Sequence, residues 1–158
     1  MTFSSTRPAT GEGWPSVVER LLLDLVEDGF TLYCCRGRTD PTALVAAYEW
    51  QRYVDLATIT GFDRVTAARV PKYGPVDVFA PETVVWAYQG NAQWALRALL
   101  NLVHPDHPDA PTEPCPAPRS LHIPRNQQRP LTIRPPSPAK ATTRATRLAA
   151  AMTTPVGR

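Results

Sequence analysis

Acidic residues are absent from the last 44 residues of the sequence, 115–158. That stretch carries eight Arg and Lys residues and a net charge of +8, whereas residues 1–114 carry nine cationic and fourteen acidic residues and a net charge of −5. Such an asymmetry indicates a segment that contacts a polyanion or an acidic surface. The excess of Arg, fifteen against two Lys, is by itself typical of a GC-rich genome. The lack of acid is therefore the stronger signal.

Cysteines and long apolar runs are also scarce. The sequence has three cysteines, Cys34, Cys35 and Cys115, of which two are adjacent. An odd number and an adjacent pair do not build a disulfide framework, so the cysteines favour a reducing compartment. The longest apolar stretch, residues 21–26, is interrupted by Asp24 and is far too short to span a membrane. Residues 1–13 lack the apolar segment of a secretory signal. We therefore expect a cytoplasmic protein that does not enter a membrane.

Known catalytic and cofactor motifs are missing as well. The sequence has no Gly-rich phosphate loop and no Gly-x-Ser-x-Gly elbow. A doubled His-Pro-Asp at residues 104–109 contains metal-ligand residue types, but the prolines around it indicate a helix stop instead. Carboxylates such as Asp55 and Asp63 have no spacing that fixes their separation. The sequence thus predicts no catalytic residue, no metal site and no cofactor, and favours a protein that is not an enzyme.

The prolines divide the chain into regions. Eleven of the eighteen fall within residues 105–138, which excludes continuous helix or a central strand there. We predict a disordered N-terminus over residues 1–13 and an α+β domain over 14–104. An extended proline-rich segment that could dock on the domain follows over 105–134, and a flexible basic tail over 135–158.

Periodicity within the domain predicts helix, several strands, then helix. A capping box at Ser16 and Glu19 begins a helix that Gly29 ends, and a second helix covers residues 92–103. Strands are expected over residues 30–35, 53–60, 65–70 and 83–89. Residues 43–50 are ambiguous, because their alanines favour helix whereas apolar residues at every second position favour a strand, which we prefer. The fold class is α+β, a small antiparallel sheet of about four to six strands with two helices on one face.

Two groups of unusual residues within the domain have a structural interpretation. Cys34 and Cys35 lie within an expected strand, so one thiol should fill the core and the other should be half exposed. Aromatic residues alternate along the strands as core residues do, although they could also line a groove. These aromatics are Tyr48, Trp50, Trp86, Tyr88 and Trp94.

A short repeat lies in the proline-rich segment. Residues 119–123 and 129–133 share the frame Arg-x-Leu-x-Ile, ten residues apart. A pure linker has no need for paired aliphatic residues, so Leu121, Ile123, Leu131 and Ile133 are predicted to dock. They could add strands to a sheet edge in this molecule or in a partner.

Three stretches, residues 84–88, 98–100 and 127–134, resemble small actinobacterial proteins to which no activity is assigned. The resemblance agrees with a GC-rich genome and with a bacterial cytoplasmic setting. It implies no site residue.

Two functional hypotheses follow. In the first, the protein is a small binding or regulatory module whose basic residues contact an acidic partner, with nucleic acid as the preferred candidate. The predicted contact residues are Arg119, Arg125, Arg129, Arg134, Lys140, Arg144 and Arg147. In the second, it is a protein–protein adaptor that uses the repeated segments as added strands. A small enzyme whose pocket the sequence does not reveal is a third alternative, and nothing in the sequence indicates an oligomeric state.

Overall fold

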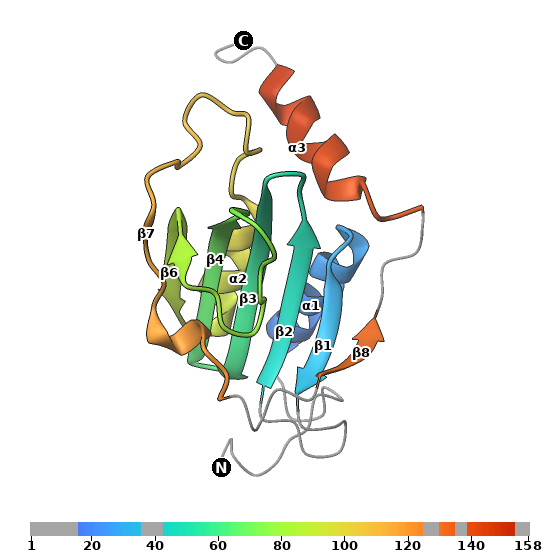
Figure 1. Cartoon of the computed structure of the whole chain (residues 1–158). Helices are drawn as coiled ribbons and strands as arrows, with labels where there is room; N and C mark the ends of the chain where they lie inside the picture. The colour runs from blue at the N-terminus through green and yellow to red at the C-terminus, as the bar shows by residue number, and fades with distance from the viewer. Residues whose placement is uncertain (1–15, 36–42, 125–129, 135–138, 154–158) are drawn as a thin grey trace.

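The computed structural model describes residues 16–35, 43–124, 130–134 and 139–153, and Figure 1 shows their arrangement. Six strands form one antiparallel sheet in the order β6-β4-β3-β2-β1-β8. Their bounds are β1 Thr31–Cys35, β2 Ala43–Glu49, β3 Tyr53–Gly61, β4 Arg64–Pro71, β6 Trp86–Gly90 and β8 Pro130–Arg134. Two short strands, β5 (Thr83–Val84) and β7 (Cys115–Pro116), pair separately. The helices are α1 (Ser16–Glu27), α2 (Ala92–Leu100) and α3 (Thr143–Thr153), with a 3-10 turn η1 (Arg119–Leu121).

The predicted fold class is confirmed. The structure is an α+β fold in which α1 and α2 pack on the same face of the sheet, as the order of elements predicted. The ambiguous residues 43–50 supply strand β2, so alternation rather than the helix propensity of alanine decided their structure. Both long neighbours of β2 are antiparallel to it.

One core lies between the sheet and the two helices. The inward residues of α1 and α2 meet side chains at every second position of β1 to β4. The buried helix residues are Val18, Leu21 and Leu25 of α1 and Ala92, Ala95, Leu96 and Leu99 of α2. This layer is the conventional part of the fold, and the hydrophobic stripes on both helices predicted it.

The opposite face of the sheet is covered by loops and the short 3-10 turn η1, and not by an α-helix of the described residues. The loop between β4 and β5 lays Val76 and Val78 on it, and the segment after α2 adds Leu121 and Ile123, both buried. A backbone hydrogen bond of 2.8 Å from the Ile123 amide to the Phe79 carbonyl joins these two coverings. Leu121 and Ile123 of the proline-rich segment are thus part of the covering of this sheet face.

The two copies of the Arg-x-Leu-x-Ile repeat fold differently. The first forms η1, whereas the second forms β8, which extends the sheet by pairing antiparallel with β1. Leu131 stands opposite Cys34 in that pairing. The two copies of the frame thus do not share one conformation, and the first places Leu121 and Ile123 in buried positions on the domain.

Helix α3 lies within residues 135–158, the segment that the sequence predicted to be a flexible tail. Flexibility there remains a prediction, but the helix has defined hydrogen bonds with the domain through Arg144. The path of the chain into α3 depends on Gly29, whose φ of 107° favours glycine. A Cβ at this position would also lie 2.5 Å from the Lys140 carbonyl oxygen, so the chain that leads into α3 passes directly over it. No helix in the described part of the chain has both the length and the apolar character needed to cross a bilayer.

Candidate functional site

A network of buried charges lies at one end of the helix-covered sheet face, and Asp55 is at its centre. Asp55 of β3 stands opposite Arg69 of β4 in the strand register, and the side chains of both are fully buried. Arg69 donates from Nε to Oδ1 at 2.7 Å and from Nη2 to Oδ2 at 2.9 Å. The indole Nε1 of Trp50 donates to Oδ2 at 2.8 Å. Two parallel guanidinium bonds of this kind hold a carboxylate in one orientation.

Arg144 enters the same network from α3. Its Nε and Nη2 donate to Oδ2 of Asp55 at 3.1 and 3.0 Å, and its Nη1 donates to Oδ2 of Asp28 at 3.0 Å. It also reaches the carbonyl oxygens of Leu99 at 2.7 Å and Leu100 at 3.3 Å. The residue is fully buried. A guanidinium removed from water needs its donors satisfied, and each nitrogen of Arg144 has a partner.

Two further cations of the C-terminal segment bind carboxylates at the end of α1. Arg147 donates from Nε and Nη2 to the two oxygens of Asp28 at 2.9 and 2.8 Å. This hydrogen bonding raises the pKa of Arg147, so its charge is permanent. Lys140 lies 2.7 Å from Glu27. Three positive charges of the segment 139–153 thus hold it to carboxylates of the domain.

The carbonyl oxygens at the end of α2 balance the network. Three arginines face two carboxylates, which leaves one positive charge unmatched. The carbonyls of Leu99, Leu100 and Val103 accept hydrogen bonds from these arginines. The end of a helix carries partial negative charge, so it is a favourable place for the additional cation.

The carboxylates of this arrangement hold arginine side chains. Both oxygens of each carboxylate accept hydrogen bonds from guanidinium groups. His104, which could have joined Asp55 in acid–base chemistry, packs edge-on against Trp50 with ring centroids 4.8 Å apart. Its Nδ1 accepts from the Asp106 amide at 3.0 Å. Asp63 lies apart, with 85% of its side chain exposed.

The second His-Pro-Asp has the same local structure as the first. His107 accepts from the Asp109 amide through Nδ1 at 2.9 Å. Each histidine therefore closes its own turn, which agrees with the interpretation of residues 104–109 as a helix stop. Within the described residues, His, Cys, Asp and Glu side chains do not gather into a group of three that could bind a metal.

The cysteines lie in contrasting environments. Cys34 and Cys35 point to opposite faces of β1, and both are buried. The expectation of one half-exposed thiol was wrong, because the loops that cover the second sheet face bury Cys35 as well. Burial, with a smaller effect of Cys34, raises the pKa of Cys35 to about 11. Cys115 in β7 is exposed.

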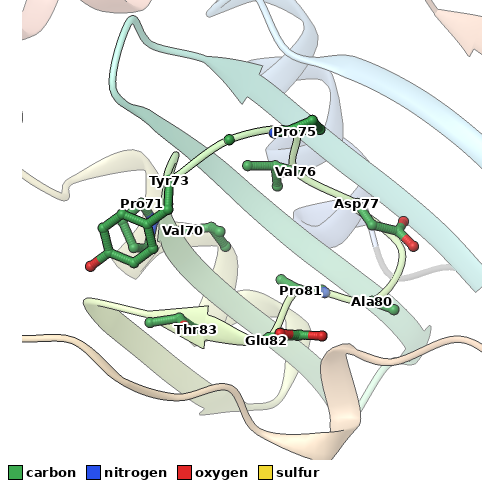
Figure 2. A pocket seen from close by; sticks show the side chains of 11 residues that line it. Val70, Pro71, Tyr73, Pro75, Val76, Asp77, Ala80, Pro81, Glu82 and Thr83 are labelled. Atoms are coloured by element: carbon green, nitrogen blue, oxygen red, sulfur yellow. The ribbon is translucent and has the colours of Figure 1, made fainter.

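The loop that joins β4 to β5 encloses a pocket of about 370 Å³. Figure 2 shows Val70 and Val76 turned into this space, while Tyr73 and Asp77 point away from it. Asp77 also accepts from the Phe79 amide at 2.9 Å, which fixes the loop. Asp77 and Glu82 are its acidic lining residues, and among the described residues that line it none is cationic or a histidine. The pocket therefore combines an apolar floor with two acidic residues at its lining.

No protein-family model, curated protein or solved structure matches the chain. Function must therefore be inferred from these groups themselves, and the resemblance to actinobacterial proteins adds nothing to them.

The predicted basic residues divide into two sets. Arg144, Arg147 and Lys140 are paired within the molecule, whereas Arg119 is exposed at the start of η1. Arg134 is the last residue of β8. Arg125 and Arg129 lie outside the described residues. The set available to an acidic partner is therefore smaller than the sequence suggested.

The predicted docking residues are placed on the domain. Leu121 and Ile123 are buried on the second sheet face, and Leu131 and Ile133 belong to β8. The aromatic residues divide between core and surface. Tyr48 and Trp50 are buried and Trp86 is partly buried, whereas Tyr88 and Trp94 are exposed.

Sequence reasoning did not identify Asp28, Arg69 and Asp55 as partners of the C-terminal segment. One signal was present: Asp55 and Arg69 are charged residues in otherwise apolar strands, at positions where the alternation calls for a core residue. A charge at such a position needs a buried partner. The sequence does not show that the third partner lies 89 residues after Asp55.

Proposed function

We propose that the protein is a small, non-enzymatic binding module whose C-terminal third contacts an acidic partner. Nucleic acid is the preferred candidate for this partner. The observation that supports this most is the division of the basic residues. Carboxylates of the domain neutralise the cations of α3, whereas Arg119 stays exposed in a stretch that contains no acid. The contact residues of this proposal are Arg119, Arg125 and Arg129.

The segment that covers the second sheet face holds the backbone at Arg119 in place. Leu121 and Ile123, two and four residues further on, are buried, so the backbone at Arg119 is held against the domain. Arginine suits phosphate because its guanidinium donates two parallel hydrogen bonds. Contacts of this kind reach the nucleic-acid backbone and carry little sequence information. Binding should therefore depend weakly on sequence and steeply on salt.

The size of the salt effect follows from the number of arginines. With about three phosphates neutralised on duplex DNA, the logarithm of the binding constant should fall with the logarithm of salt concentration with a slope of roughly −3. All eight cations of residues 115–158 acting together would give a slope of about −7. The slope thus reports how many of the basic residues remain available.

The test is a titration of labelled duplex DNA with the full chain at two salt concentrations. The variant R119Q/R125Q/R129Q should lose most of the binding. A matched control, R20Q/R52Q/R64Q, removes the same charge from exposed positions of the domain and should bind like the original chain. Equal binding by both triple variants, or no binding by the original chain at low salt, would exclude the proposed contact.

One observation supports a second function, protein recognition by strand addition. In this chain β8 already adds to the edge of β1, with Leu131 opposite Cys34. The β8 segment could add in the same way to a sheet edge of a partner if it left β1. Such binding would depend on Leu131 and Ile133 and would tolerate salt, which separates it from the first proposal.

A further inference from the structure

The carboxylate of Asp28 has an unusual set of partners. It lies at the end of α1 with only 5% of its side chain exposed. In the described part of the chain, the side chains that donate to it are Arg144 and Arg147, and both belong to α3. A buried carboxylate without a cation is costly. The domain therefore contains a site that is incomplete until an arginine-bearing helix occupies it.

The remaining parts of this site come from elements other than α3. Arg69 and Trp50 orient Asp55, and the end of α2 presents the carbonyls of Leu99 and Leu100. The ring of Phe30 lies 5.3 Å from the Arg144 guanidinium carbon, a distance that suits cation–π contact. The site thus combines two carboxylates, a helix end and an aromatic face, which are all groups that favour arginine.

The occupying helix has a defined signature. Arg144 and Arg147 are three residues apart, so they lie on one face of α3, and Leu148 enters the helix-covered core beside them. Ala145 lies between them, and its amide donates to the Tyr48 hydroxyl at 3.2 Å, a contact that brings the helix backbone close to the sheet. The signature is therefore Arg-Ala-x-Arg-Leu.

We propose that the end of the domain bearing Asp28 and Asp55 is a receptor site for an Arg-Ala-x-Arg-Leu helix, and that α3 of a second copy of this chain can fill it in place of the chain's own α3. The contacts are the same within one chain or between two, which is the condition for exchange of an element between protomers. Charge also favours a second copy. Its α3 segment brings Arg144, Arg147 and Lys140 to the three carboxylates Asp55, Asp28 and Glu27.

Two complementary full-chain variants test the exchange. R144A/R147A keeps the receptor but lacks the arginines, and D28N keeps the arginines but weakens the receptor. Each variant alone should be monomeric, and an equimolar mixture should form a one-to-one dimer detectable by sedimentation velocity. In the control, the triple variant D28N/R144A/R147A replaces D28N in the mixture with R144A/R147A. This mixture should contain no dimer. Two folded variants that remain monomeric when mixed would overturn the proposal.

A peptide of residues 139–153 gives a second measurement. It should bind the R144A/R147A chain, and a version with Lys at both arginine positions should bind at least about tenfold more weakly, because Lys lacks the two-pronged donor. If R144A/R147A does not fold, R147A/L148A replaces it in both experiments. Equal binding of the two peptides, or no binding of either, rejects the receptor. Selective peptide binding without dimer formation rejects a second copy as its occupant.

Discussion

Asp55 shows at the scale of one residue why a buried charge can be stable. Its two oxygens accept from Arg69, Arg144 and Trp50. Replacing Asp55 with Ala would leave Arg69 buried without a carboxylate and remove one of the two carboxylates of Arg144, a loss of about 3–5 kcal/mol of unfolding free energy. Urea denaturation measures it. The control D63A changes an exposed carboxylate and should stay within about 0.5 kcal/mol of the original chain. A loss of less than about 1 kcal/mol for D55A would contradict the burial of this network.

The cysteines give a prediction about reactivity. Burial raises the pKa of Cys35 to about 11, so its thiol stays protonated at neutral pH, whereas Cys115 is exposed. A thiol reagent should therefore modify one cysteine in the folded protein and all three after denaturation. C115S should reduce the native count to zero. Rapid reaction of C115S at neutral pH would show that the second sheet face is not covered.

The raised pKa of Cys35 also has a consequence for stability. Unfolded Cys35 loses its proton near its ordinary pKa of 9.0, while the folded thiol keeps it until about 11. The unfolded state then binds fewer protons than the folded state, so the free energy of unfolding should fall as pH rises from about 9 to 11. Comparing urea denaturation of the original chain and C35A across this window measures the contribution, which C35A should lack. An equal decline in both proteins would assign it to other groups.

At the scale of elements, local sequence predicted conformation well where apolar residues follow one period. The stripe on α1 and the alternation in β2 both led to the correct element. The repeated Arg-x-Leu-x-Ile frame predicted apolar docking, but not that one copy would form η1 and the other β8. Their conformations depend on the surface each copy meets, a sheet face or a sheet edge, which is a property of the tertiary structure.

The first copy of the repeat should contribute strongly to stability. Leu121 is fully buried against the second sheet face, so L121A should cost about 2–5 kcal/mol of unfolding free energy through lost burial and a residual cavity. L23A removes the same atoms from a side chain that is 51% exposed, and should cost much less. Thermal or urea unfolding of both variants measures the difference. Similar small losses would mean that η1 does not hold the proline-rich segment on the domain.

Helix α3 allows a direct test of the predicted flexibility of residues 135–158. The Arg144 amide donates to the Asp28 carbonyl at 3.0 Å, and the Ala145 amide donates to the Tyr48 hydroxyl at 3.2 Å. If the helix stays docked, both amides should exchange with solvent more slowly than an isolated helix of this length allows. Hydrogen exchange followed by NMR measures this, with R144A/R147A as the undocked control. Exchange as fast as in that control would show that the segment is flexible.

At the scale of the whole molecule, the charge asymmetry of the sequence has two parts. The counts of −5 and +8 predicted attraction to an acidic surface, and some of that surface belongs to the chain's own domain. Counting charges could not distinguish the two, because a partner in the same chain and a phosphate backbone both attract arginine. Burial distinguishes them: Arg144 is buried and Arg119 is exposed.

Salt should therefore affect folding and nucleic-acid binding to different degrees. Pairs removed from solvent are screened little, so raising salt from about 50 to about 200 mM should change the unfolding free energy by less than about 1 kcal/mol. With three phosphate contacts, the same change should weaken DNA binding about 40-fold. Urea denaturation and DNA titration of one preparation at the two salt concentrations measure both effects, and R119Q/R125Q/R129Q should lose the second and keep the first. A large loss of stability at high salt would mean that the arginines of α3 are exposed to solvent ions. A salt effect on DNA binding near that expected for eight cations would mean that these arginines leave the domain to bind phosphate.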